Sequence, residues 1–409
     1  MMNIPFSPPY IDDEVKQEVL STLDSGWITS GPKVVALEKL VAEKTSLGHV
    51  VCCNSATSGL LLMLHWYGIG KGDEVIIPAY TYAATALVVI HAGATPVMVD
   101  VADDFNIDIE KIRNKITEKT KAIIPVDIAG WPCDYDKIFN LVDSDNIKTR
   151  FTPANDKQKQ LGRIMVLSDA AHSIGAIYNN IPSGKCADFT VFSFHAVKNV
   201  TTAEGGAVCI HVPDDLFDHG KIYKELKLMS LNGQTKDAFT KNQGGGWRYD
   251  IVMAGYKINM PDICAAIGLA QLKKYHQVIL PARKKVFDAY SVAFQKYSWA
   301  QLPPLDNEMK TSSYHLYALR IVNITEAQRD KMIDYIAQHG VAVNVHFQPL
   351  PLLTLFKERG YKIEDYPVAF NNYSREISLP IYPELDLIKI NYIVATIATA
   401  YETVLQSKS

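Results

Sequence analysis

The chain has 409 residues, of which 48% are hydrophobic and 21% are charged, so it is long enough for two or more domains with large cores. The 41 Lys and Arg residues against 44 Asp and Glu residues give a formal net charge of −3, and no basic run carries interleaved aromatic residues. These features argue against a nucleic-acid or anionic-membrane partner and favour small-molecule substrates.

The N-terminal residues, Met1 to Val15, lack the basic and apolar regions of a secretory signal. The best candidate for a membrane span, Tyr392 to Leu405, is interrupted by Thr, Tyr and Glu. The six cysteines form no CxxC pair and no zinc spacing, which is typical of reduced thiols and predicts no metal site. We therefore expect a cytoplasmic protein.

In chain order, the first predicted element is an amphipathic helix from Asp12 to Leu23. From about residue 50 to residue 210, apolar runs typical of strands alternate with helical patterns. This alternation predicts an α/β fold with a mostly parallel sheet covered by helices on both faces. The expected strands are Glu74 to Pro78, Thr95 to Val101, Lys121 to Ile128, Arg163 to Leu167, Phe189 to Phe194 and Gly206 to Ile210.

Polar residues from Asp143 to Gln160 predict a surface insertion without chemistry. Residues 213–275 favour helix apart from the glycine-rich 243–247, which predicts a loop that reaches a neighbouring subunit. From about residue 280 a long helix leads into strands and helices. We therefore predict a large domain over residues 1–275, including an N-terminal helical segment over 1–35, and a smaller C-terminal α+β domain over 276–409.

Asp169 and Lys198 are the most informative pair of residues. Asp169 follows the apolar run Ile164 to Leu167, and Lys198 comes just after the strand expected at Phe189 to Phe194. Both side chains would therefore emerge at the C-terminal edge of the sheet, where open α/β sheets bind ligands. Pyridoxal phosphate needs a lysine amine to hold its aldehyde and a carboxylate to keep its ring nitrogen protonated. A lone lysine after a strand is more often a surface residue. A lone aspartate at the end of a strand is more often the cap of a turn or helix.

Three further features fit the same site, and each has a structural alternative. The small hydroxyl residues in Asn54 to Gly59 precede an apolar helix whose N-terminus would hold a phosphate, or they simply cap that helix. Tyr82 would stack on a pyridine ring or belong to the core. His172 would form a hydrogen bond with the cofactor's phenolic oxygen or be structural.

Two glycine-containing segments, 68–73 and 183–185, fit no dinucleotide or P-loop pattern, so neither predicts a nucleotide-binding site.

Several motifs in the same order resemble the DegT-type pyridoxal-phosphate-dependent nucleotide-sugar aminotransferases, nearly end to end. Within that family, the closest resemblance is to enzymes that aminate 4-keto sugars, such as the UDP-4-amino-4-deoxy-L-arabinose:oxoglutarate aminotransferases. The motifs are Ile4-Pro5-Phe6, Ser25 to Pro32, Gly72 to Ile76, Phe192 to Asn199, Ala203 to Gly206, Gly255 to Asn259 and Ser378 to Pro383.

The resemblance implies an aspartate-aminotransferase-like fold and a role for each matching residue. Lys198 would hold the cofactor covalently and act as the catalytic acid and base, and Asp169 would pair with the ring nitrogen. The phosphate would lie at Ala56, Thr57, Ser58 and Ser193, with Tyr82 on the ring and His172 at its phenolic oxygen. The family also implies a homodimer with shared active sites, in which the partner's Lys257 approaches the phosphate.

The same resemblance implies a nucleotide-linked ketosugar as substrate and L-glutamate as amino donor, for polysaccharide, lipopolysaccharide or glycan biosynthesis. Asp127 stands where relatives usually carry His, a change that would alter sugar recognition. Weak candidates for lining the sugar pocket are Trp27, Arg248, His315 and His346.

Two competing functions are weighed against transamination. Sugar dehydratases with the same fold replace the cofactor-holding lysine with His, so Lys198 argues against a dehydratase. A non-catalytic cofactor-binding regulatory protein would predict a damaged site, whereas the lysine, the aspartate and the phosphate segment all look intact.

Overall fold

The computed structural model describes residues 2–236 and 248–406. Within these residues, a seven-stranded sheet runs in the order β1-β9-β8-β5-β4-β2-β3. Strand β9 pairs antiparallel with β1 and β8, and the remaining neighbours are parallel. The strands are β1 (Val50–Cys53), β2 (Glu74–Pro78), β3 (Thr95–Val99), β4 (Thr120–Ile123), β5 (Met165–Asp169), β8 (Phe189–Ser193) and β9 (Gly206–Ile210).

All six strands expected from the sequence are present, and the prediction of a mostly parallel α/β sheet is confirmed. Strand β1 is not among the strands that the sequence pattern predicts. Strand β4 ends at Ile123 rather than at Ile128, because Pro125 has no N–H to donate to the ladder. The chain still runs beside β5 there, since Val126 forms an isolated bridge with Asp169. This arrangement brings the loop after β4 next to the C-terminal end of β5.

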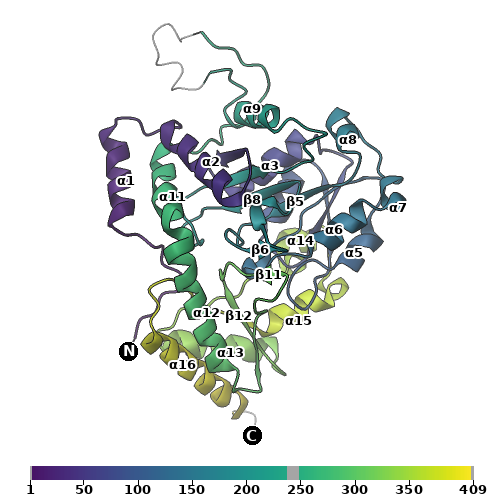
Figure 1. Ribbon diagram of the computed structural model, residues 1–409. Coiled ribbons are helices and arrows are strands. Elements are labelled where there is room, and N and C mark those ends of the chain that lie inside the picture. The colour runs from purple at the N-terminus through teal and green to yellow at the C-terminus, as the bar shows by residue number, and fades with distance from the viewer. Residues whose placement is uncertain (1, 237–247, 407–409) are drawn as a thin grey trace.

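Alternating side chains of the strands pack into separate cores on the two faces of the sheet, as the period of a strand requires. Val75 and Ile77 face one core with helices α3 (Ala56–Trp66) and α4 (Ala84–His91), while Ile76 faces the other. Figure 1 shows the helices around the sheet. The others are α1 (Asp13–Asp24), α2 (Pro32–Thr45), α5 (Ile109–Lys115), α6 (Tyr135–Val142), α9 (His219–Ser230) and α11 (Asp262–Lys274).

The segment from residue 143 to residue 160 lies mostly at the surface, as its polar sequence predicts, but it also packs on the large domain. It folds into α7 (Asp145–Lys148) and the start of α8 (Asp156–Leu161), with Ile147 buried. Gln158 is also buried, and its side-chain amide donates to the carbonyl of Tyr67 at 3.1 Å. The segment therefore caps the C-terminal end of α3, although the two are 91 residues apart in the chain.

Helix α11 passes through a π-helical turn at Tyr275–Ile279 into α12 (Leu280–Phe294), so the predicted boundary after residue 275 falls inside a continuous helical run. A second core lies between α12 and the sheet β10-β12-β13, at the lower end in Figure 1. Its other elements are β10 (Ala300–Gln301), β12 (Tyr317–Ile321), β13 (Glu376–Leu379), α13 (Glu326–Gln338) and α16 (Leu387–Gln406).

The C-terminal half is not wholly separate from the first core. Leu350, Phe356 and Tyr373, in and around α14 (Thr354–Glu358) and α15 (Pro367–Arg375), pack with the helices of the large sheet. A small sheet also joins the halves, because β11 (Lys310–Thr311) pairs with β6 (Ile177–Tyr178), which pairs with β7 (Ile181–Pro182). The two-domain division stays a prediction. Among the described residues, no helix is both long and apolar enough to cross a membrane.

Candidate active site

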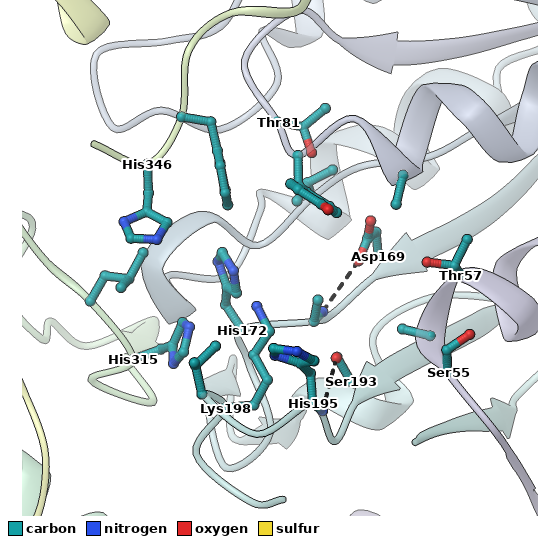
Figure 2. Close-up of a pocket in the computed structure, with 18 of the residues that line it drawn as sticks. Ser55, Thr57, Thr81, Asp169, His172, Ser193, His195, Lys198, His315 and His346 are labelled. Atoms are coloured by element: carbon teal, nitrogen blue, oxygen red, sulfur yellow. Dashed lines mark hydrogen bonds between the residues drawn. The ribbon is translucent and has the colours of Figure 1, made fainter. Parts of the chain in front are cut away.

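A cavity of about 470 Å³ opens at the C-terminal edge of β5 and β8, where the sequence predicts the site. Its walls include the start of α3, the segment before α4, the ends of β5 and β8, and three segments of the C-terminal half. Figure 2 shows its polar side chains pointing toward one another. Among the predicted site residues, the cavity is lined by Ala56, Thr57, Tyr82, Asp169, His172, Ser193, Lys198, His315 and His346.

Asp169 is the last residue of β5, and its side chain is held at the cavity wall by two hydrogen bonds. Thr85 donates its hydroxyl to Oδ2 at 2.8 Å, and the backbone N–H of Ala171 donates to Oδ1 at 3.3 Å. Only 6% of Asp169 is exposed. Burial raises the pKa of its carboxyl, and the hydrogen bond from Thr85 counteracts that rise. A cationic group in the cavity would stabilise the ionised carboxylate.

Lys198 lies in the turn after β8, where its backbone N–H donates to the carbonyl of His195 at 2.9 Å. The side chain is partly buried, and Figure 2 shows it extending into the cavity among the histidines. Burial lowers the pKa of its amine to about 8, although the charge of Asp169 favours the protonated form. At pH 7, about a tenth of this amine is therefore neutral and nucleophilic.

The opposite wall of the cavity is the N-terminus of α3. Ser55 caps the helix, since its hydroxyl oxygen accepts the backbone N–H of Ser58 at 3.1 Å. Ala56 and Thr57 line the cavity, whereas Ser58 does not, and the hydroxyl of Ser58 accepts a hydrogen bond from that of Ser55 at 2.9 Å. Free amides and the helix dipole at such a terminus attract an anion. The capping and anion-binding interpretations therefore apply to the same residues.

The close packing of α3 on β9 depends on Gly206. A Cβ atom at this position would lie 2.6 Å from the backbone N of Ala56 and 2.7 Å from the carbonyl carbon of Ser55. Neither backbone atom can move without shifting the start of the helix. Glycine at position 206 thus lets the N-terminus of α3 reach the cavity beside Ser193.

Two buried histidines share the wall between the halves of the chain, with ring centroids 4.4 Å apart. Nδ1 of His172 accepts the backbone N–H of Ala129 at 3.2 Å, so its Nε2 keeps the proton. Nδ1 of His315 lies 2.9 Å from Oδ1 of Asn199, an acceptor, so the proton of His315 is on Nδ1. Burial lowers the pKa of both imidazoles well below its usual range. Both rings are therefore neutral.

His346 and Tyr82 line the cavity mouth. Burial, together with the nearby charge of Lys198, lowers the pKa of His346 to about 4. Tyr82 is 64% exposed, and its ring centroid lies 5.8 Å from that of Phe347. An exposed ring at the mouth has room to stack on a bound ligand, so the stacking role of Tyr82 stays a prediction.

Besides Ser58, three predicted residues lie outside the cavity of this chain. The indole N–H of Trp27 donates to the carbonyl of Ser30 at 3.2 Å, beside the start of α2. Arg248 is exposed. Lys257 is exposed too, and its amine donates to Oδ1 of Asn259 at 2.6 Å. The loop expected at 243–247 lies outside the described residues.

Asp127 does not face the cavity. Its buried carboxylate accepts hydrogen bonds from the backbone N–H of Cys133 and the hydroxyl of Tyr135, both at 2.9 Å, and from the hydroxyl of Ser173 at 2.6 Å. The expected effect of Asp127 on sugar recognition is therefore not supported by contact. The residue instead ties the loop after β4 to neighbouring loops.

The sequence patterns do not identify the residues that orient Asp169 and His315. Thr81 and Thr85 lie on either side of Tyr82, and their spacing of four residues is a usable signal. Asn199 directly follows Lys198, but its contact with His315 joins positions 116 residues apart. Phe347 lines the cavity without any local pattern that marks it.

Comparison with known proteins shows the relationships of the chain. The model of the DegT/DnrJ/EryC1/StrS aminotransferase family matches residues 9–151 and 154–398. Spr1654 of Streptococcus pneumoniae, assigned as a sugar aminotransferase and solved in its PMP form, is 45% identical over 98% of this chain and 100% of its own, with a TM-score of 0.94. Its PLP form superposes with a TM-score of 0.93.

Two curated relatives are also similar along nearly their whole length. The spore coat polysaccharide biosynthesis protein SpsC of Bacillus subtilis is 35% identical over 93% of both chains. The UDP-4-amino-4-deoxy-L-arabinose–oxoglutarate aminotransferase of Shewanella sediminis is 32% identical over 97% of both chains.

Proposed function

This chain belongs to the DegT/DnrJ/EryC1/StrS aminotransferase family, and we propose that it transfers an amino group from L-glutamate to a keto carbon of a nucleotide-linked sugar. The chain is a pyridoxal-phosphate-dependent aminotransferase. The observation that carries the proposal is the meeting of Lys198 and Asp169 at one cavity, opposite the N-terminus of α3. A 4-keto sugar is the proposed acceptor because a relative aminates that position, and the products are an aminosugar and 2-oxoglutarate.

The residues of the cavity fit the chemistry of the cofactor. Asp169 is a buried carboxylate with two donors and a raised pKa, so a protonated ring nitrogen beside it would supply the missing positive charge. The terminus of α3, with Thr57, and the hydroxyl of Ser193 offer donors to a phosphate dianion. Lys198 has a partly neutral amine, which is the form that captures an aldehyde.

Each residue has a proposed task. When bound, pyridoxal phosphate supplies an electron sink that stabilises negative charge at the α-carbon of the amino donor. Nζ of Lys198 would take the proton from that α-carbon and return it at the cofactor, which requires the amine to be neutral. Asp169 would keep the ring nitrogen protonated. His172, whose Nε2 carries its proton, would donate to the ring oxygen.

The partner subunit is also part of the proposal. Lys257 is exposed and lies outside the cavity of its own chain, so it is available to a second copy. We propose a homodimer in which the partner's Lys257 approaches the phosphate. A cytoplasmic location and a role in polysaccharide or lipopolysaccharide biosynthesis are part of the same proposal. The relative SpsC, named for spore coat polysaccharide biosynthesis, supports the role in polysaccharide biosynthesis.

Two half-reactions, followed separately by visible absorbance, test this function. The cofactor-loaded protein is mixed with L-glutamate, and we expect its visible band to bleach as 2-oxoglutarate forms. The bleached protein is then offered UDP-, dTDP- and GDP-linked ketosugars, and the matching sugar should restore the band. A band that L-glutamate leaves unchanged would contradict the donor, and a bleached protein that no ketosugar restores would contradict the acceptor class.

A further inference from the structure

His346 is connected to two fully buried side chains of β13 behind the cavity wall. Its Nδ1 lies 2.9 Å from Oγ of Ser378, and that Oγ lies 2.5 Å from Oε1 of Glu376. The other carboxyl oxygen, Oε2, accepts the backbone N–H of His346 at 3.1 Å. Asn344 and Ser378 form an antiparallel bridge, which places residues 344–346 alongside β13. The three side chains therefore form a continuous path of hydrogen bonds that ends in the cavity.

The direction of this path follows from the number of protons it holds. A hydroxyl has one proton to donate, and the backbone N–H of His346 makes Oε2 of Glu376 an obligatory acceptor. If Glu376 is ionised, Oε1 also accepts, so Ser378 donates to it and receives the proton of Nδ1. If Glu376 is protonated, Oε1 donates to Ser378, and Ser378 donates to a bare Nδ1. The two states thus require opposite tautomers of His346.

We propose that Glu376 and Ser378 are positioning residues that decide which ring nitrogen of His346 carries the proton. Ionised Glu376 leaves Nε2 bare, so the cavity is offered a hydrogen-bond acceptor. Protonated Glu376 puts the proton on Nε2, so the cavity is offered a donor. A keto oxygen accepts only from the donor form, whereas a sugar hydroxyl can donate to the acceptor form. This last step rests on the proposed ketosugar substrate.

The groups around the path keep the ring neutral and Glu376 close to its titration point. Burial raises the pKa of Glu376 to about 8, against the nearby charges of Arg329 and Arg320. The pKa of His346 lies at about 4, so near neutral pH its tautomer changes and its charge does not. The other titratable groups that face the path are the hydroxyl of Tyr80, which donates to the carbonyl of His346, the amine of Lys198, and the neutral rings of His172 and His315.

Replacing Glu376 with Gln gives a sharp test, because the backbone fixes the orientation of the new amide. The N–H of His346 must face the amide oxygen, so the NH₂ group faces Ser378 and donates to it. Ser378 then donates to Nδ1 at every pH. Nitrogen NMR of histidine-labelled protein without cofactor reads the tautomer directly, and a His346→Gln variant assigns the signal.

We expect wild-type His346 to carry its proton on Nε2 at about pH 6 and on Nδ1 at about pH 10. The Glu376→Gln variant should keep the proton of His346 on Nε2 at both pH values. Ser378→Ala should remove the pH dependence, and Ser378→Thr should restore it.

Ser291→Ala, which removes a buried hydroxyl in the second core, is the matched control and should behave as wild type. The same tautomer in wild type and Glu376→Gln at about pH 10 would overturn the proposal. The half-reactions with L-glutamate are measured separately, so a failed function and a failed tautomer switch are distinguishable.

Discussion

Thr85 donates a 2.8 Å hydrogen bond to the carboxylate of Asp169, and the hydroxyl of Thr81 lies 2.9 Å from that of Thr85. All three side chains are buried. The first turn of α4 thus orients the acidic group at the end of β5, and the donated hydrogen bond keeps the pKa of Asp169 lower than burial alone would. The electronic partner of the cofactor depends on a residue 84 positions earlier in the chain.

We expect Thr85→Val to weaken cofactor binding by about tenfold, because a hydrogen bond to a charged group contributes about 1.5 kcal/mol or more. The variant keeps the shape of the side chain but removes the donor, so the pKa of Asp169 rises further. Absorbance titration of the cofactor-free protein measures the dissociation constant. Thr120→Val, a buried threonine on β4 away from the cavity, is the control. Equal affinities for both variants would contradict this role.

Lys198→Arg should abolish both the covalent attachment of the cofactor and transamination, with a loss in rate of at least about a thousandfold. A guanidinium stays protonated and cannot capture an aldehyde. Mass spectrometry after borohydride reduction shows whether the cofactor is attached. Lys137→Arg, at an exposed lysine of α6 outside the cavity, should leave attachment unchanged. Normal turnover by Lys198→Arg would rule out the assignment.

The rate at which the cofactor-free protein captures the aldehyde should rise with pH and level off above about pH 8. Only the neutral amine reacts, and burial lowers the pKa of Lys198 from 10.5 to about 8. The neutral fraction therefore increases about tenfold per pH unit below that value and is nearly complete above it. Stopped-flow absorbance at several pH values measures this profile. A rate that continues to rise up to about pH 10 would show an unperturbed lysine.

Gly206→Ala should lower cofactor affinity and reduce the free energy of unfolding. Its Cβ would lie 2.6 Å from the backbone N of Ala56, so the start of α3 must shift away from the cavity. Gly48→Ala is the matched control, because its Cβ would meet no atom within 4 Å. Affinity titration and thermal unfolding of both variants measure the difference. If Gly206→Ala binds as well as Gly48→Ala, the terminus of α3 does not hold the phosphate.

Mixing two defective variants tests whether the active sites are shared. In a mixed dimer of Lys198→Ala and Lys257→Ala, one site lacks both lysines and the other has both. If the partner's Lys257 serves each site, the mixture should therefore regain activity that neither variant has alone, up to about half of wild type per mixed dimer. If the mixture shows only the average of the activities of the two variants, the partner's Lys257 does not serve the site that contains Lys198.

Local patterns predicted much of the fold and the site. Buried parallel strands read as continuous apolar runs, so six strands of the large sheet could be found from sequence. Asp169 and Lys198 could be paired because residues at the C-terminal ends of neighbouring parallel strands meet at one edge. The polar sequence after α6 predicts a surface segment but not the burial of Gln158, whose side chain contacts Tyr67, 91 residues earlier in the chain.

The local sequence specifies the chemical groups of the site: a lysine, a carboxylate and a capped helix start, each placed by the strand or helix next to it in the chain. The properties of these groups depend on how the chain packs in three dimensions. Burial brings the pKa of Lys198 to about 8, Thr85 orients Asp169, and Glu376 reaches His346 through Ser378. Desolvation and hydrogen-bond direction depend on neighbours that are far apart in sequence, so no local pattern encodes them.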